Sequence, residues 1–484
     1  MENVKRASVQ AFAFGAISMA LYIVYGWVQN SVLFPRFADY FPIGREIDTF
    51  LRAVICVAIA FVFGRKPAVF NASACSLASI VLMIPATALL YAACALQSAA
   101  LTVIGLICFE IGHTWSYLVL GVALCRLGSP RVTALAVAFG IMAGDIIRHF
   151  VGILPLAEGM AAFAILPIVT IILCGKAAKS FLDGFSSGTA PSDLEIANPK
   201  AFLKPTSALF ICILFFSIAS GFGLTLNEIN NAPNISNLEW MPVAIVALMV
   251  AVHRKPGGED SLFSFSVLIV IAGFLLAPFT FGDGTGSANA LLRGGRSCFD
   301  ILVWTVVAAI GMRNPSALVA AICVSNAMRS IGTIIGAMAG HLVNAIAPMN
   351  SLTASAITAY ALFFFLAFLW VGFRSFSFEA TVRNLESPAA PSCSTPPEEE
   401  SFADRCATIG TSFGLSEREI EVFEMLARGR NVNFIQEHFV ISRNTVKTHV
   451  KRIYKKLGVH SQQELIDLVE QNETAPKPQS SETM

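Results

Sequence analysis

Charge is scarce in this chain of 484 residues: Asp, Glu, Lys and Arg make up 13% of it, whereas soluble globular domains carry about 25%. Tyrosine is also rare, with 7 residues against 38 phenylalanines, so most aromatic side chains lack a polar group. The scarcity of charge excludes a disordered protein and an ordinary soluble enzyme. The hydrophobic content of 55% indicates a multi-pass membrane protein, since no other class needs so much apolar surface.

Clustered metal ligands and catalytic motifs are missing as well. The 11 cysteines are dispersed from Cys56 to Cys406, and none forms a C-x-x-C or Cys/His pattern. This spacing predicts neither a disulfide framework nor a zinc site. The sequence also has no phosphate-binding glycine loop and no nucleophile elbow. We therefore predict no catalytic residue, no metal site and no cofactor, and hence a protein that is not an enzyme.

Long apolar runs fill residues 1–375. A helix that crosses the bilayer needs about 20 apolar residues, and only helices and closed barrels satisfy their own backbone there. Because the runs are continuous rather than alternating, we expect an all-α, polytopic bundle, in which Gly332, Gly336 and Gly340 predict close helix packing. Twelve spans are expected near residues 10–33, 48–64, 68–92, 98–125, 132–154, 156–174, 207–227, 238–252, 262–281, 287–311, 315–345 and 351–373.

Loop charges predict the orientation of the bundle, because cytoplasmic loops are enriched in Lys and Arg. Basic residues follow every second span, and the loops between them have none apart from the first, which carries Arg36 and Arg45. This pattern places both termini in the cytoplasm. We expect the chain to lie in the lipid bilayer of a bacterial inner (cytoplasmic) membrane.

The two halves of the bundle repeat each other. Arg65-Lys66-Pro67 after the second span recurs as Arg254-Lys255-Pro256 after the eighth, and Cys108-Phe109-Glu110 recurs as Cys298-Phe299-Asp300. A 6+6 pseudo-repeat with a long central loop at 176–206 resembles the major facilitator superfamily, whose halves are related by an axis along the membrane normal. The acidic-and-glycine loop motif of those transporters is absent. The resemblance implies a central cavity between the halves.

Ionisable side chains inside the predicted spans need an explanation, because each costs about 2.5–3.5 kcal/mol at the bilayer centre. One interpretation is a cavity for a small, anionic or aromatic ligand, with arginines as anion partners. The other is that the charges pair with one another and hold helices together. The candidate ligand-binding residues are Glu110, His113, Asp145, Arg148, His149, Arg293, Arg296, Asp300, Asn326 and Arg329.

The composition changes near residue 376. We expect a flexible Pro/Glu-rich linker over 376–411, a small helical domain over 412–470 and a disordered tail over 471–484. In the helical domain, Ser416 and Glu419 form a capping box that begins the first of four predicted helices. The third of these helices carries six basic residues and no acid, which is the electrostatic signature of phosphate contact. They are Arg443, Lys447, Lys451, Arg452, Lys455 and Lys456.

Several short motifs of this domain are similar to the LuxR/FixJ/NarL-type helix-turn-helix. They are Leu415-Ser416-Glu417-Arg418-Glu419, Leu426-Ala427-Arg428-Gly429, Thr445-Val446-Lys447-Thr448-His449-Val450 and Ile453-Tyr454-Lys455-Lys456-Leu457-Gly458-Val459. The resemblance implies that the third helix enters the major groove of double-stranded promoter DNA, with Lys447, Thr448 and Lys451 facing bases. It assigns mainly phosphate contacts to Arg443, Asn444, Thr445 and Lys455.

The same resemblance implies a homodimer through the fourth helix and leaves RNA polymerase open as a further partner. The second helix departs from the family pattern, since Val432 and Phe434 replace polar residues. This change weakens a phosphate contact or creates a docking surface.

These features together predict a membrane-embedded one-component transcriptional regulator. In this hypothesis the twelve-helix domain senses a small molecule and the helix-turn-helix binds DNA. The alternative is a transporter of a small solute with a regulatory DNA-binding tail. A further alternative is a tail that binds protein rather than DNA.

Overall fold

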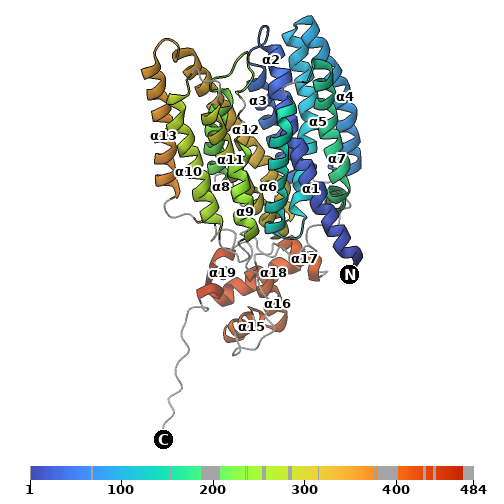
Figure 1. Cartoon of the computed structure of the whole chain (residues 1–484). Coiled ribbons are helices and arrows are strands. Elements are labelled where there is room, and N and C mark those ends of the chain that lie inside the picture. The colour runs from blue at the N-terminus through green and yellow to red at the C-terminus, as the bar shows by residue number, and fades with distance from the viewer. Residues whose placement is uncertain are drawn as a thin grey trace. The chain divides into compact units, whose positions relative to one another are not determined.

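In the computed structural model, the regular secondary structure of the described residues is helical, apart from one isolated β-bridge between Ile229 and Ala232 (Figure 1). The chain divides into two units, Met1–Ala390 and Pro391–Met484, and each is described by itself. The described residues are 2–66, 69–151, 154–186, 208–234, 236, 238–252, 258–281, 286–313, 315–373, 377–378, 402–428, 432–439, 443–459 and 461–471.

Among its described residues, the first unit has twelve principal helices at the positions of the twelve predicted spans. Eleven are long and apolar enough to cross a membrane, and the chain is a multi-pass membrane protein. The exception is α9, whose 13 residues rise only about 20 Å against a hydrocarbon core of about 30 Å. The helices are α1 (Glu2–Val28), α3 (Gly44–Arg65), α4 (Ala72–Leu96), α5 (Ala99–Cys125), α6 (Pro130–Ile147), α7 (Leu156–Ser186), α8 (Ala208–Thr225), α9 (Trp240–Val252), α10 (Glu259–Leu276), α11 (Ser287–Arg313), α12 (Pro315–Ile346) and α13 (Ser351–Phe373).

Three of these helices continue in short irregular segments. Helix α1 passes through a π-helical turn, η1 (Gln29–Leu33), into α2 (Phe34–Phe37). Helix α6 ends in the 3-10 turn η3 (Arg148–Phe150), and α10 ends in η5 (Ala277–Phe279). Such π-turns within helices are frequent at functional sites.

The predicted 6+6 repeat is visible in the way the helices pack. In the first half α1 packs on α6 and α4 on α5; in the second half α8 packs on α12 and α10 on α11. Across the halves, α3 packs on α12 and, in the equivalent position, α9 packs on α6. In each half, therefore, the second and fifth helices pack against the other half.

The packing of α8 against α12 depends on glycine. A Cβ atom on Gly336 would lie 2.0 Å from the carbonyl oxygen of Ile218, and one on Gly332 would lie 2.3 Å from that of Leu214. Gly221 on α8 meets the backbone of Thr333 equally closely, at 2.3 Å. The glycine spacing in α12 thus serves contact within the bundle, as predicted.

The chain just after α13 is fixed to the bundle. The side chain of Phe378 is buried against the rings of Phe263 and Phe299, with centroids 4.9 and 6.0 Å away. The backbone N–H of Phe378 and the hydroxyl of Ser377 donate to the Asp260 carboxylate at 2.7 and 2.6 Å. The predicted linker therefore begins, at residues 377–378, with an anchored segment rather than a free one.

The second unit is a small helical domain with its own core. Its helices are α15 (Phe402–Ser412), α16 (Glu417–Ala427), α17 (Val432–Phe439), α18 (Arg443–Leu457) and α19 (Gln462–Gln471). Buried side chains from these helices, among them Val422, Phe423 and Ile453, form one cluster. The expected capping box is present, because Ser416 accepts from the N–H of Glu419 and Glu419 accepts from the N–H of Ser416.

Helix α15 corrects the predicted linker. Residues 402–411 were expected to be flexible, but they form most of a helix whose Cys406 and Ile409 are buried in the core of the second unit. The apolar residues on this short helix cover one side of α16. The rest of the predicted linker and tail, apart from residue 471 in α19, lies outside the described residues.

Candidate functional site

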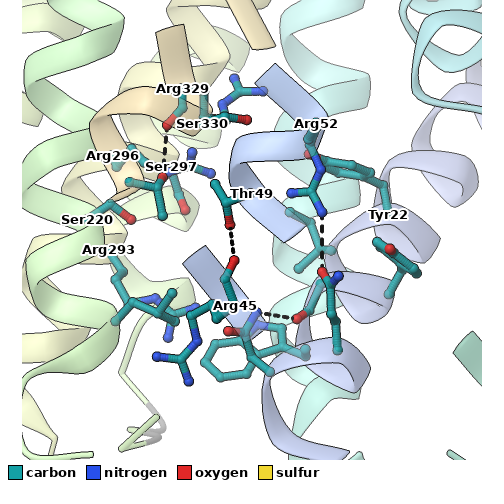
Figure 2. A pocket seen from close by; sticks show the side chains of 18 of the residues that line it. Tyr22, Arg45, Thr49, Arg52, Ser220, Arg293, Arg296, Ser297, Arg329 and Ser330 are labelled. Atoms are coloured by element: carbon teal, nitrogen blue, oxygen red, sulfur yellow. Dashed lines mark hydrogen bonds between the residues drawn. The ribbon is translucent and has the colours of Figure 1, made fainter. Parts of the chain in front are cut away.

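A polar cavity of about 170 Å³ lies between the two halves of the bundle. Figure 2 shows Tyr22 and Arg52 on one wall, with Ser220 and Arg296 opposite them. The π-helical turn contributes directly, because Gln29 and Asn30 both line the cavity. Its charged lining consists of Arg45, Arg52, Asp145, Glu239, Arg293, Arg296 and Arg329.

Arg52 of α3 is held by two buried carboxylates on the first wall. It contacts Glu110 of α5 at 2.9 Å and Asp48, one turn earlier on α3, also at 2.9 Å. Gln29 donates to Asp48 at 2.7 Å, and His113 lies 3.3 Å from Glu110. The carboxylates of Asp48 and Glu110 are covered behind Arg52, so the guanidinium group is what this wall presents to the cavity.

Asp300 of α11 is the matching carboxylate on the second wall. It contacts Arg329 of α12 at 2.6 Å and Arg296 of α11 at 2.9 Å. Arg329 also donates to the hydroxyl of Tyr117 at 2.7 Å, a bond that joins α12 to α5 of the other half. The predicted correspondence between Glu110 and Asp300 is therefore chemical as well as positional, since each binds arginine.

A third group surrounds Trp27. Arg148 pairs with Glu239 and lies 3.6 Å from Asp145, while Arg293 lies 3.7 Å from Glu239. The guanidinium groups of Arg148 and Arg293 both cover the Trp27 ring, 4.5 and 3.9 Å from its centroid. Arg148 is fully buried, and it joins η3 of the first half to the segment before α9.

The halves are also joined by a fourth group beside the loop before α9. Arg45, in the first turn of α3, contacts Glu228 at 2.8 Å and is buried. His341 of α12 lies between Glu228 and Glu46, 2.6 and 3.0 Å away. Arg45 is thus engaged in a structural ion pair, which explains why it breaks the loop-charge pattern.

The structure brings most of the predicted ligand-binding residues together. Five of them line the cavity: Asp145, Arg293, Arg296, Asn326 and Arg329. Two more, Arg148 and Asp300, pair with members of that set. Glu110 holds the cavity residue Arg52, and His113 contacts Glu110. His149 does not belong to this set: it lies half-exposed on η3, because the helix tightens after Ile147 and turns it away.

Sequence reasoning missed several cavity residues. Arg52 lies inside a predicted span and was not singled out, although Asp48 four residues earlier is a recognisable helical partner. Glu239 was assigned to a span start, and its role depends on arginines far away in sequence. Trp27 and Ser220 carry no signal of their own in the sequence.

In the second unit, α18 presents basic side chains to solvent. Val446 and Ile453 are fully buried, and this leaves Lys447, Lys451 and Lys455 on the exposed surface. None of these three lysines makes an ion pair among the residues described in this unit. Asn444, Thr445 and Thr448 are exposed as well, whereas the side chain of Arg443 lies outside the described residues.

Lys456 differs from its neighbours on α18. Its ammonium group contacts Glu419 at 2.7 Å and the carbonyl oxygen of Gly414 at 2.8 Å. It therefore fastens α18 to the start of α16. Val432 is one of the two residues that replace polar residues of the LuxR-type pattern. It is half-buried and lines a groove beside Lys447 and Tyr454. The side chain of the other, Phe434, is not among those described.

A polytopic bundle and a helix-turn-helix with an exposed basic helix define a membrane-bound protein with a DNA-binding domain. Residues 414–469 match the family described as bacterial regulatory proteins, luxR family, so the second unit contains a LuxR-type helix-turn-helix. The Fimbriae Z protein of Salmonella typhimurium is 41% identical over 59 residues, which are 12% of this chain. The match spans 28% of the length of that relative.

Solved structures similar to the first unit are transporters of the major facilitator superfamily. The E. coli fucose:proton symporter has 14% identity and a TM-score of 0.45, over 76% of this chain and 98% of that chain. A proton:xylose symporter has 11% identity and a TM-score of 0.47, over 78% and 98% of the two chains.

Proposed function

We propose that this chain is a membrane-embedded one-component transcriptional regulator, in which the bundle senses a small molecule and the helix-turn-helix binds promoter DNA. The observation that carries the proposal is the presence, in one chain, of a LuxR-type domain and a bundle with an arginine-lined cavity. Neither a luxR-family domain nor a transporter fold is enzymatic, which supports a protein without catalytic residues.

The DNA-binding part of the proposal assigns roles along α18. Lys447, Thr448 and Lys451 read base edges in the major groove, and Arg443, Asn444, Thr445 and Lys455 contact phosphates. The exposure of the described members of this set supports both roles. Helix α19 forms the homodimer, and RNA polymerase is the further partner on the promoter.

The proposed location is the inner membrane, with both termini in the cytoplasm. The alternation of basic and non-basic loops supports this orientation, and the buried pair of Arg45 with Glu228 removes one of its exceptions. In the cytoplasm the DNA-binding domain has access to the chromosome. A reporter that works only in the cytoplasm should be active when it is fused to the C-terminus, and a reporter that works only in the periplasm should be inactive there. The reverse result contradicts the orientation.

Replacement of two lysines tests DNA binding. Because a base contact contributes about 1–3 kcal/mol, the double variant Lys447→Ala/Lys451→Ala is expected to lose at least about 30-fold in promoter affinity. The measurement is binding of full-length protein in nanodiscs to promoter fragments, identified beforehand by chromatin capture. Arg428→Ala, which removes a positive charge from the end of α16, serves as the control for net charge. Unchanged affinity and salt dependence in the double variant would instead favour a tail that binds protein.

A transporter with a regulatory tail is the second candidate, favoured by the position of the cavity between two pseudo-repeats. The two candidates differ in turnover. A regulator binds its ligand without moving it, so proteoliposomes should show saturable binding and no accumulation of radiolabelled ligand inside. Accumulation that stops when Arg329 is replaced by Gln would establish transport.

A further inference from the structure

We propose that the cavity binds a small organic anion, a carboxylate held by Arg293, Arg296 and Arg329 on the wall formed by α11 and α12. The inference rests on the proposed function, in which this cavity receives a small molecule, and it names the chemical class of that molecule. It is carried by three observations: donors without partners, an unbalanced charge and the shape of the lining.

The first observation concerns hydrogen-bond donors. Nη1 of Arg293 and Nε of Arg329 are buried and have no hydrogen-bond partner. The distance from Arg293 Nη1 to Glu239 is 3.7 Å, longer than a hydrogen bond. Glu239 Oε1, the oxygen at that distance, and Asp145 Oδ2 also lack a hydrogen-bond partner. Because an unsatisfied buried donor is costly, Nε of Arg329 is the atom that points to an acceptor that completes the site.

The second observation is the charge of this wall taken together with the group around Trp27. Four guanidinium groups, of Arg148, Arg293, Arg296 and Arg329, are in contact with three carboxylates, of Asp145, Glu239 and Asp300. One positive charge therefore lacks a counterion in a buried setting, where a neutralising anion is strongly favoured.

The opposite wall does not supply that counterion. Asp48 and Glu110 together outnumber Arg52, but both carboxylates are buried behind it and neither lines the cavity. The carboxylates of Asp145 and Glu239 also line the cavity, but five arginines line it as well, so a ligand entering it meets an excess of guanidinium groups, with arginines on both sides. This arrangement favours an acceptor-rich group over an amine.

The third observation is the volume of the cavity and the chemical character of the residues that line it. A volume of about 170 Å³ is below the roughly 300–1,000 Å³ of pockets for drug-sized ligands, so the ligand is compact. The rings of Tyr22, Trp27 and Phe34 line the same space as the hydroxyls of Ser220 and Ser297. A flat apolar group can pack against these rings, and an arginine guanidinium group can donate two parallel hydrogen bonds to a carboxylate.

The test uses acetate, benzoate and 3-phenylpropionate, each beside its neutral amide, and benzylamine as the cation. Thermal unfolding of the full-length protein in detergent is followed by tryptophan fluorescence at constant ionic strength, and the melting temperature, Tm, is measured. At least one carboxylate is expected to raise Tm by about 2–4 °C at saturating concentration, while its amide and benzylamine do not. A panel in which no carboxylate stabilises the protein, or in which amides do so equally, overturns the assignment.

Two variants separate ligand contacts from structural pairing. Arg296→Gln removes the unbalanced charge, so Tm without ligand is expected to stay the same or rise, and affinity for the stabilising carboxylate to fall at least tenfold. Arg36→Gln, an exposed arginine outside the cavity, is expected to leave both unchanged. If Arg296→Gln lowers Tm without altering the response to carboxylates, the arginines are structural pairs. The readout needs no DNA, so failure of anion binding is distinct from failure of the regulator proposal.

Discussion

Glu419 shows how one buried carboxylate stabilises the DNA-binding unit. Its side chain accepts from Lys456 and from the backbone N–H of Ser416, and these bonds lower its pKa to about 2. Because the folded pKa lies below the ordinary value of 4.5, the stabilisation is fully present above pH 4.5. It is lost as the pH falls toward 2.

Glu419→Gln is therefore expected to lower the free energy of unfolding of this unit by about 1–2 kcal/mol at neutral pH, since a hydrogen-bonded charge pair is lost. The difference from the unmodified protein should shrink between pH 4.5 and pH 2. Pepsin cleavage within residues 415–459 of the full-length protein measures this opening over the acidic range, and hydrogen exchange measures it at pH 7. Glu421→Gln, which breaks an exposed pair with Arg418, should have almost no effect. Equal effects of the two substitutions would contradict the assignment.

At the scale of helices, the contact of α8 with α12 makes a clear prediction. Gly336→Ala places a methyl group against the Ile218 backbone and forces the helices apart, at a cost of about 1–3 kcal/mol or more. Gly64→Ala, on α3, meets nothing within 4 Å and should be neutral or slightly stabilising, since alanine favours helix. Thermal unfolding of both variants in the same detergent compares them directly. Equal melting temperatures would show that α12 packs differently.

The sequence predicted helices better than it predicted their partners. The apolar runs located all twelve helices, and the stripe with Val446 and Ile453 correctly oriented α18. Hydropathy gave the eighth span nearly the bounds of α9 but counted it with the full spans. It did not reveal that residues 402–411 are helical, because burial there depends on neighbouring helices.

The candidate cavity was predictable in its residue types but not in its pairing. An arginine in a span is visible in sequence, whereas its partner is chosen by the fold. Arg52 and Glu110 are 58 positions apart, and Arg148 and Glu239 are 91 positions apart. No periodicity within one helix connects residues at such separations, so Arg52 was missed and Arg45 was mistaken for a loop charge.

For the whole molecule, the anchor at Phe378 predicts how the bundle communicates with the DNA-binding unit. Phe378 packs on Phe299, the residue before Asp300, which binds two cavity arginines. Asp260→Asn and Phe378→Ala weaken this anchor. Both are expected to reduce the effect of ligand on promoter binding at least threefold and to leave ligand-free DNA affinity unchanged. DNA binding by nanodisc-embedded protein, with and without the stabilising carboxylate, measures this coupling; full ligand response in both variants would exclude this route.

The same anchor sets a limit on where the protein can act. Between Phe378 and the start of α15 at Phe402, a chain of this length reaches at most about 80 Å. A DNA site must therefore come within roughly that distance of the bilayer, because the protein cannot leave the membrane to find it. Under the proposed function, the DNA comes to a regulator that diffuses only in the plane of the membrane. Genes held close to the membrane would then be the ones that it can reach.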